Sequence, residues 1–174
     1  VVVVHARKAI LKGLTPKQNR EVPPLDYARA WRVKEEFPSL TVVVNGGLRS
    51  CASVLEALRD SDGVMIGREA YRRPWLLAEL QQALYPEDAW TPPDAATVLE
   101  TMAAYASREG ESGTPLSTIT RRMLGLLSGR PGARDYRHLM SAGPREGVGA
   151  AGLFARAARQ LRDREGEERV EGTA

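Results

Sequence analysis

The sequence contains one cysteine, Cys51, among its 174 residues, and it has no apolar run of the length, about 18 residues, that a membrane span requires. A single cysteine excludes a disulfide within the chain and a cysteine-rich zinc site. Such low cysteine content is typical of a reducing, intracellular compartment. We therefore predict a cytoplasmic protein with no membrane segment and no bound metal.

The chain also lacks an initial Met and any basic segment at its start. It opens on Val1–Val4, which does not resemble a signal peptide. These residues resemble a buried strand in a sequence cut immediately before it. We therefore expect a further N-terminal part of the protein to precede Val1.

Positive charge exceeds negative charge only slightly, since 25 basic and 22 acidic residues give a net charge of +3. Hydrophobic residues make up 43% of the chain, enough for a core, and charged residues make up 27%. This composition excludes a disordered or fibrous protein. A length of 174 residues allows one ordinary domain or two small ones.

Three short β-branched runs predict strands at Val1–Val4, Thr41–Val44 and Gly63–Ile66. They are nearly all apolar, as in strands of a parallel sheet buried on both faces. Helical patterns follow them at residues 26–37, 50–59 and 69–84, the last with a bend near Pro74. Three strands are too few for a stable open sheet of this kind. We therefore predict that residues 1–84 are the C-terminal half of an α/β TIM barrel, (β/α)₈.

The remaining sequence shows no strand pattern. Residues 85–93 contain three prolines and predict a linker. Residues 94–163 predict a small all-helical domain, with apolar periodicity at 94–107, 116–127 and 153–161. The charged, glycine-containing residues 164–174 predict a disordered tail.

Glycine-containing turns follow two of the predicted strands. Asn45, Gly46 and Gly47 follow the second strand, and Gly67 and Arg68 follow the third. Glycines at this end of a strand let backbone N–H groups approach an anion, and an adjacent arginine can bind phosphate bidentately. The loops after the last two strands are the usual phosphate site of a TIM barrel. Each motif alone is also a common turn, but the pair favours a phosphorylated cofactor.

His5 follows the first predicted strand and is succeeded by Arg7 and Lys8. At this position in a barrel a histidine points into the mouth of the active site. The imidazole then contacts a cofactor or substrate, with the basic pair near an anionic ligand. The alternative is a histidine satisfied within the core, with Arg7 and Lys8 as solvated loop charges.

Positive charge is concentrated in two segments. The loop at residues 9–24, with Lys8 at its start, contains Lys12, Lys17 and Arg20 against a single acid, Glu21. Between residues 114 and 162 nine arginines face only two acids, and Arg134 and Arg137 lie close to Tyr136 and His138. Both segments could be ordinary solvated surface, but the one-sided arginine excess favours RNA binding.

Cys51 lies in the first turn predicted after the Gly46–Gly47 motif. A helix start can lower a thiol pKa and make a nucleophile. We interpret Cys51 instead as a small apolar packing residue.

Four segments together resemble one known family: VHARKAILKGLTPKQNREVPPLDY, VVVNGG, DGVMIGREAYRRPWLL and TRRMLGLLSGRPGARDYRHLM. They are similar to the tRNA-dihydrouridine synthases, in the bacterial A-type subfamily, from residue 1 to about residue 142. The resemblance implies a monomeric FMN enzyme that uses NADPH to reduce uridines 20 and 20a in the D-loop of tRNA to 5,6-dihydrouridine.

The resemblance also implies roles for individual residues. His5 matches a histidine that contacts the flavin, and the two glycine motifs match the phosphate-binding segments. Lys17 and Arg20 match tRNA-contacting loop positions, and Arg134 with Arg137 matches tRNA contacts of the helical domain.

The family's catalytic cysteine, and the lysine and glutamine that contact its flavin, lie before the first residue of this sequence, and Cys51 is in the wrong place to replace that cysteine. We therefore expect no activity from this chain alone. Two alternatives stay open: a non-catalytic tRNA-binding remnant of a disrupted synthase, and another phosphate-binding barrel with an unrelated helical appendage.

Overall fold

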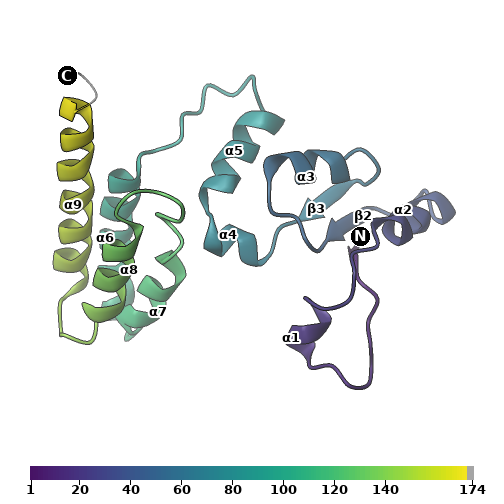
Figure 1. The fold of residues 1–174 in the computed structure, drawn as a ribbon, viewed down its shortest axis with the longest axis horizontal. Helices are drawn as coiled ribbons and strands as arrows, with labels where there is room; N and C mark the ends of the chain where they lie inside the picture. The colour runs from purple at the N-terminus through teal and green to yellow at the C-terminus, as the bar shows by residue number, and fades with distance from the viewer. Residues whose placement is uncertain (172–174) are drawn as a thin grey trace. The chain divides into compact units, whose positions relative to one another are not determined.

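The computed structural model describes residues 1–171, which form two compact units (Figure 1). The first unit comprises residues 1–70 and 75–86, and the second comprises residues 71–74 and the chain from Glu87 onward. No helix of the described residues has both the length and the apolar character needed to cross a membrane.

The first unit is an α/β structure built on a three-stranded parallel sheet. Its strands are β1 (Val2–His5), β2 (Val42–Asn45) and β3 (Gly63–Met65), in the order β1-β2-β3. The parallel sheet expected from the three apolar runs is confirmed. The register pairs His5 with Asn45 and Asn45 with Met65. The ends of all three strands therefore meet at one edge of the sheet.

The core of this unit lies around β2. Val42, Val44, Val54 and Leu76 are fully buried. Val3 of β1, in contrast, is 56% exposed. Met65 of β3 is also 50% exposed, and neither β1 nor β3 contains a buried residue. The prediction that all three strands are buried on both faces is therefore wrong for β1 and β3, which each have a neighbouring strand on one side only among the described residues and so have fewer packing partners than β2.

Each helix of the first unit begins or ends where the local chemistry requires it. They are α1 (Pro16–Asn19), α2 (Tyr27–Glu36), α3 (Cys51–Ala57), the first three residues of α4 (Arg68–Arg72) and α5 (Trp75–Leu84). Asp26 and Ser50 cap α2 and α3 through side-chain oxygens that accept backbone N–H groups. The bend predicted near Pro74 is a complete break between α4 and α5, because proline disfavours helical geometry in the residue before it.

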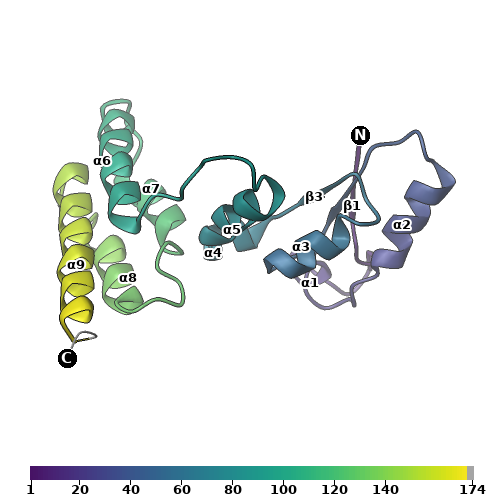
Figure 2. The same ribbon diagram turned by 90° about the horizontal axis from the view of Figure 1, so that it is seen from above.

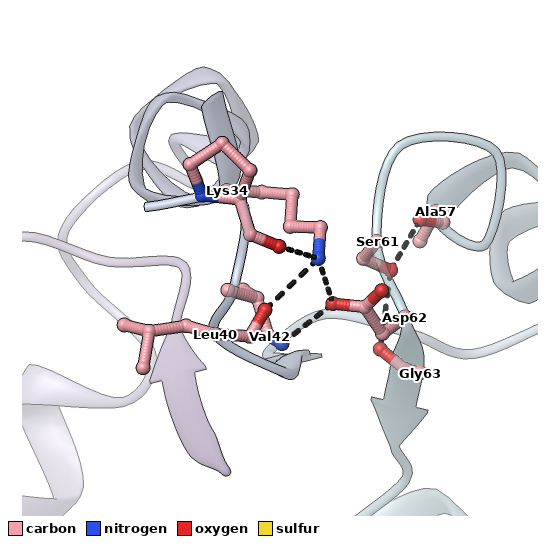
Figure 3. Close-up of polar contacts among 8 residues, drawn as sticks. Lys34, Leu40, Val42, Ala57, Ser61, Asp62 and Gly63 are labelled. Atoms are coloured by element: carbon pink, nitrogen blue, oxygen red, sulfur yellow. Dashed lines mark hydrogen bonds and ion pairs between the residues drawn. The ribbon is translucent and has the colours of Figure 1, made fainter. Parts of the chain in front are cut away.

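A polar cluster joins the amino ends of β2 and β3 (Figure 3). One carboxylate oxygen of Asp62 accepts the Val42 N–H at 2.7 Å and lies 2.9 Å from the Lys34 ammonium. Lys34 also donates to the carbonyls of Pro38 and Leu40, at 3.0 and 2.9 Å. The Val42 N–H, and then the Lys34 ammonium, lower the pKa of Asp62. This cluster lies at the end of the sheet opposite the glycine turns and fixes the start of β2.

The second unit is helical. Its helices are α6 (Ala95–Glu111), α7 (Leu116–Met123), α8 (Ala133–Ala142) and α9 (Ala150–Glu171). Helices α6 and α9 lie alongside each other in both views (Figures 1 and 2). Leu99, Leu153 and Phe154 are fully buried and form the centre of this packing.

Helix α9 continues to Glu171, whereas the sequence predicted a disordered tail from residue 164. Arg164 of α9 pairs with Asp135 of α8, which attaches the beginning of this segment to the bundle. The four glutamates and one arginine that follow within α9 are good helix formers. Residues 172–174 of the predicted tail lie outside the described part of the chain.

Residues 71–74 belong to the helical unit, although the sequence assigned them to the segment 1–84. The Arg122 guanidinium lies 5.5 Å from the centre of the Tyr71 ring. Gly125 approaches the Tyr71 carbonyl so closely that a Cβ at this position would overlap it. The lack of a side chain at Gly125 lets this short segment approach the turn after α7, and the cation–π contact of Arg122 holds it against α7.

Candidate anion site and nucleic-acid surface

Two hydrogen bonds link three polar groups across the carboxyl edge of the sheet. The His5 Nδ1 atom lies 2.6 Å from the Asn45 side-chain oxygen, and the Asn45 amide nitrogen donates to the Met65 carbonyl at 2.6 Å. The parallel register places these residues side by side on adjacent strands. The structure therefore brings His5 and Asn45, both predicted site residues, into direct contact.

These two hydrogen bonds determine the tautomer of His5. A backbone carbonyl only accepts hydrogen bonds, so the Asn45 amide nitrogen must face Met65 and its oxygen must face His5. The His5 Nδ1 atom must then carry a proton and donate it. In the neutral ring, Nε2 keeps its lone pair and can accept a hydrogen bond from a ligand.

Gly46 and Gly47 form the turn after β2, and both have positive φ angles, 113° and 71°. A Cβ on Gly46 would lie 3.1 Å from the His5 ring, and a Cβ on Gly47 would overlap Leu25. Only glycine therefore fits these two positions without displacing the neighbouring side chains. The result is a tight backbone turn beside the imidazole.

Tyr27 holds this turn, and the sequence patterns did not single it out. Its hydroxyl donates to the Gly46 carbonyl at 2.6 Å, and its ring stacks on Trp31 with the centroids 6.2 Å apart. Burial raises the pKa of the Tyr27 phenol, although Arg7 opposes the rise, so the hydroxyl stays protonated as a donor. Tyr27 lies within a segment that carries the family resemblance, but no local pattern indicates its contact with a turn 19 residues away.

Gly67 and Arg68 follow β3, the strand next to β2, so the two glycine motifs extend from neighbouring parallel strands as predicted. Gly67 is exposed, and its carbonyl accepts the Ala70 N–H at 3.1 Å. The Arg68 guanidinium pairs with the Glu21 carboxylate of the long loop, and both side chains are close to half exposed, at 47% and 41%. Arg68 is therefore open to a further anionic partner.

The long loop after β1 is closed at its base. Arg7 and Leu25 form an antiparallel bridge, and the half-buried Arg7 side chain donates to the Pro23 carbonyl. Lys8 is exposed. Arg7 therefore acts within its own loop, while Lys8 faces solvent.

Where the sequence predicted a loop, the chain also forms the short helix α1. Thr15 and Gln18 form a capping box at its start, and the Asn19 side chain bonds both backbone groups of Ile10 at 2.8 Å. The bonds from Asn19 give the loop a defined shape. Lys17 and Arg20 are exposed on it.

In the second unit, Arg134 and Arg137 lie on the exposed side of α8. Tyr136, Leu139 and Met140 are buried on the opposite side. The Arg137 Nε atom donates to the carbonyl four residues earlier at 3.0 Å, which orients the guanidinium along the helix. The two arginines are one helical turn apart and form one basic surface.

Several other arginines of this unit have partners within it. Arg162 pairs with Glu100, Arg164 pairs with Asp135, and Arg122 lies over Tyr71. The arginine excess predicted from the sequence is therefore partly used to hold the bundle together.

Cys51 is partly buried and packs against the cluster that contains Leu48 and Val54. This contact agrees with its interpretation as a packing residue. Among the residues that the structure describes, no group of three or more His, Cys, Asp or Glu side chains is placed to hold a metal ion.

The family model described as dihydrouridine synthase (Dus) matches residues 1–159. A protein of Salmonella typhi named tRNA-dihydrouridine(20/20a) synthase is 43% identical over 162 residues, which is 93% of this chain and 48% of the relative. Its namesake in Vibrio cholerae is 48% identical over 148 residues, 84% of this chain and 45% of the relative. The chain therefore spans less than half the length of these relatives.

Proposed function

Since the chain belongs to the dihydrouridine synthase family, we propose that it is the phosphate-binding and tRNA-binding half of a tRNA-dihydrouridine synthase. The whole enzyme reduces uridines 20 and 20a in the tRNA D-loop to 5,6-dihydrouridine, using FMN and NADPH. It acts in the cytoplasm as a monomer. Two relatives carry the name tRNA-dihydrouridine(20/20a) synthase, which supports this choice of uridines.

In this proposal β1, β2 and β3 are the last strands of a TIM barrel. The parallel order and the glycine turns at the carboxyl ends agree with that architecture. In the described residues β1 and β3 each pair with one strand only. Closure of the barrel by further strands removes such free edges, which otherwise favour aggregation.

The residues at the carboxyl edge fit the phosphate of FMN. The Gly46–Gly47 turn presents backbone without side chains, in a conformation that other residues adopt only with strain. Arg68 follows the neighbouring strand and is close to half exposed, so its guanidinium can exchange or share its Glu21 partner with a phosphate. Glycine backbone N–H groups and a guanidinium are donors well suited to a phosphate dianion.

FMN, once reduced by NADPH, would supply the hydride for reduction of uracil. The residues of this chain would bind the cofactor and orient it. His5, held by Asn45, presents the Nε2 lone pair at the edge of the sheet and can accept a hydrogen bond there. Gly47 and Arg68 would hold the phosphate of the cofactor.

Two separate basic surfaces, one in each unit, are proposed to bind tRNA: the basic loop of the first unit and the exposed side of α8 in the second. Lys8, Lys17 and Arg20 are exposed on the loop, and Arg134 and Arg137 are exposed on α8. These charges contact RNA phosphates, which position the tRNA rather than read its sequence. Arg7, which is half-buried, supports the loop through Pro23 and contributes charge to the loop surface.

The observation that carries the proposal is the paired edge of β1 and β2, where His5 and Asn45 meet beside the Gly46–Gly47 turn. The test uses a synthase of full family length that carries this chain, incubated with unmodified tRNA, FMN and NADPH. Mass spectrometry of nuclease fragments should locate dihydrouridine at positions 20 and 20a. The assignment would be rejected if dihydrouridine forms only at other positions, or if none forms although the cofactors are active.

A further inference from the structure

We propose that Tyr27 is a positioning residue for the cofactor phosphate, because its hydroxyl fixes the Gly46–Gly47 peptide so that the Gly47 N–H points at the anion. The inference rests on the proposed function, which places a flavin phosphate at this turn. It gives a role to a side chain that the sequence patterns did not single out.

The peptide bond between Gly46 and Gly47 is held from its carbonyl side. The Tyr27 hydroxyl donates to the Gly46 carbonyl at 2.6 Å. The described residues contain no cis peptide bond, and in a trans peptide the carbonyl and the following N–H point in opposite directions. The Gly47 N–H therefore points away from Tyr27. Within the described part of the chain this N–H makes no hydrogen bond, so it is available to a ligand.

Tyr27 is itself held in place. Its ring stacks on Trp31 within α2, and α2 is anchored by the Asp26 cap. A Cβ on Gly47 would lie 3.2 Å from the Tyr27 hydroxyl, so the turn and the phenol are in close contact. Without the hydroxyl, a turn made of two glycines can rotate its peptide freely, because glycine adopts many backbone conformations.

The test is Tyr27→Phe in a synthase of full family length that carries this chain. Phenylalanine keeps the ring stacked on Trp31 and removes only the hydroxyl. The dissociation constants of FMN and of riboflavin, which lacks the phosphate, are measured by flavin fluorescence. We expect FMN affinity to fall by about three- to ten-fold, the effect of one hydrogen bond, with riboflavin affinity unchanged.

A matched control is Tyr136→Phe. Tyr136 donates to the Met123 carbonyl at 3.0 Å, so this change removes the same kind of bond from the helical unit. It should leave both flavin affinities unchanged. Equal losses of FMN and riboflavin affinity in Tyr27→Phe would overturn the inference, because they indicate general damage rather than a misplaced phosphate donor.

The preference of the unaltered enzyme for FMN over riboflavin tests the phosphate site separately from the role of Tyr27. If it binds riboflavin as tightly as FMN, the phosphate site itself is rejected. If it prefers FMN and Tyr27→Phe keeps that preference, only the role of Tyr27 is rejected. Should the variant fail to fold, the Gly47 amide signal of the unaltered enzyme decides: a downfield shift with FMN and not with riboflavin supports the inference, and no shift overturns it.

Discussion

The His5 imidazole and the Asn45 side-chain amide lie in direct contact across neighbouring strands, with Nδ1 and Oδ1 2.6 Å apart. Asn45 cannot turn its nitrogen toward His5, because that nitrogen donates to the Met65 carbonyl. We therefore predict that neutral His5 is protonated on Nδ1, the less common tautomer of free histidine. Nitrogen-15 NMR of the imidazoles measures this directly.

The second histidine of the sequence provides the control for that measurement. His138 is exposed on α8, so only two sets of imidazole signals arise from this chain. Asn45→Ala should shift the His5 signals toward the pattern of a free imidazole and leave those of His138 in place. Protonation of neutral His5 on Nε2 in the unaltered enzyme would contradict the orientation derived for Asn45.

Replacing Arg68 should weaken FMN retention without changing tRNA affinity. A hydrogen bond to a charged group contributes about 1.5–3 kcal/mol, so Arg68→Ala should weaken FMN binding by roughly ten-fold or more. Arg59→Ala is the control, because Arg59 is exposed near the start of β3, at the other end of the sheet. Equilibrium dialysis with FMN gives both affinities. Equal values for Arg68→Ala and the unaltered enzyme would show that Arg68 serves only its pair with Glu21.

The surface formed by Arg134 and Arg137 should determine tRNA affinity. The double change Arg134→Ala with Arg137→Ala should weaken tRNA binding and leave FMN binding intact. If both guanidinium groups contact phosphates, the slope of log affinity against log salt should become shallower by about 0.7–0.9 per lost contact. Binding titrations at several salt concentrations give both quantities.

A control for this prediction removes the same charge elsewhere in the unit. Arg156 and Arg159 are exposed on α9 and are also one turn apart. Changing both to alanine should have a much smaller effect than the α8 pair. Equal effects of the two double variants would mean that overall charge attracts the tRNA, and that α8 has no special role.

The Asp62 cluster should stabilise the fold in a pH-dependent way. The pKa of Asp62 is lowered in the folded protein, first by the Val42 N–H and then by Lys34. Its contribution is therefore present above the unfolded value of 3.8 and is lost as the pH falls through the lower folded value. Asp62→Asn should unfold at lower urea concentration than the unaltered protein at pH 7, and the difference should shrink below the unfolded value.

Asp60→Asn supplies the comparison for this experiment, since Asp60 is an exposed neighbour. It should follow the unaltered protein at every pH. A deficit of Asp62→Asn that is constant from neutral to acidic pH would show that shape, and not the carboxylate charge, explains the loss.

The strands could be predicted from the sequence because their signal is local. The run from Val42 to Val44 is apolar and β-branched, and it forms the central strand. The break at Pro74 was likewise foreseen as a bend, since proline acts on its own neighbours. The glycine motifs could be predicted for the same reason, because adjacent glycines by themselves indicate a tight turn.

The contacts that complete the site could not be predicted in this way. The bond from Tyr27 to Gly46 and the pair of Arg68 with Glu21 join residues that are distant in sequence. They exist only after α2 and the long loop have folded back onto the edge of the sheet. The continuation of α9 past residue 164 was missed because charged composition indicates disorder locally, whereas Arg164 finds a partner on α8.

The position of the FMN phosphate is the most direct test of whether this edge of the sheet is the cofactor site. A crystal structure of a full-length synthase carrying this chain, with FMN bound, would show that position. We predict phosphate oxygens within hydrogen-bonding distance, about 3 Å, of the Gly47 nitrogen and of the Arg68 guanidinium. A phosphate bound elsewhere, with Gly47 and Arg68 making no contact to the cofactor, would contradict the assignment of this edge as the cofactor site.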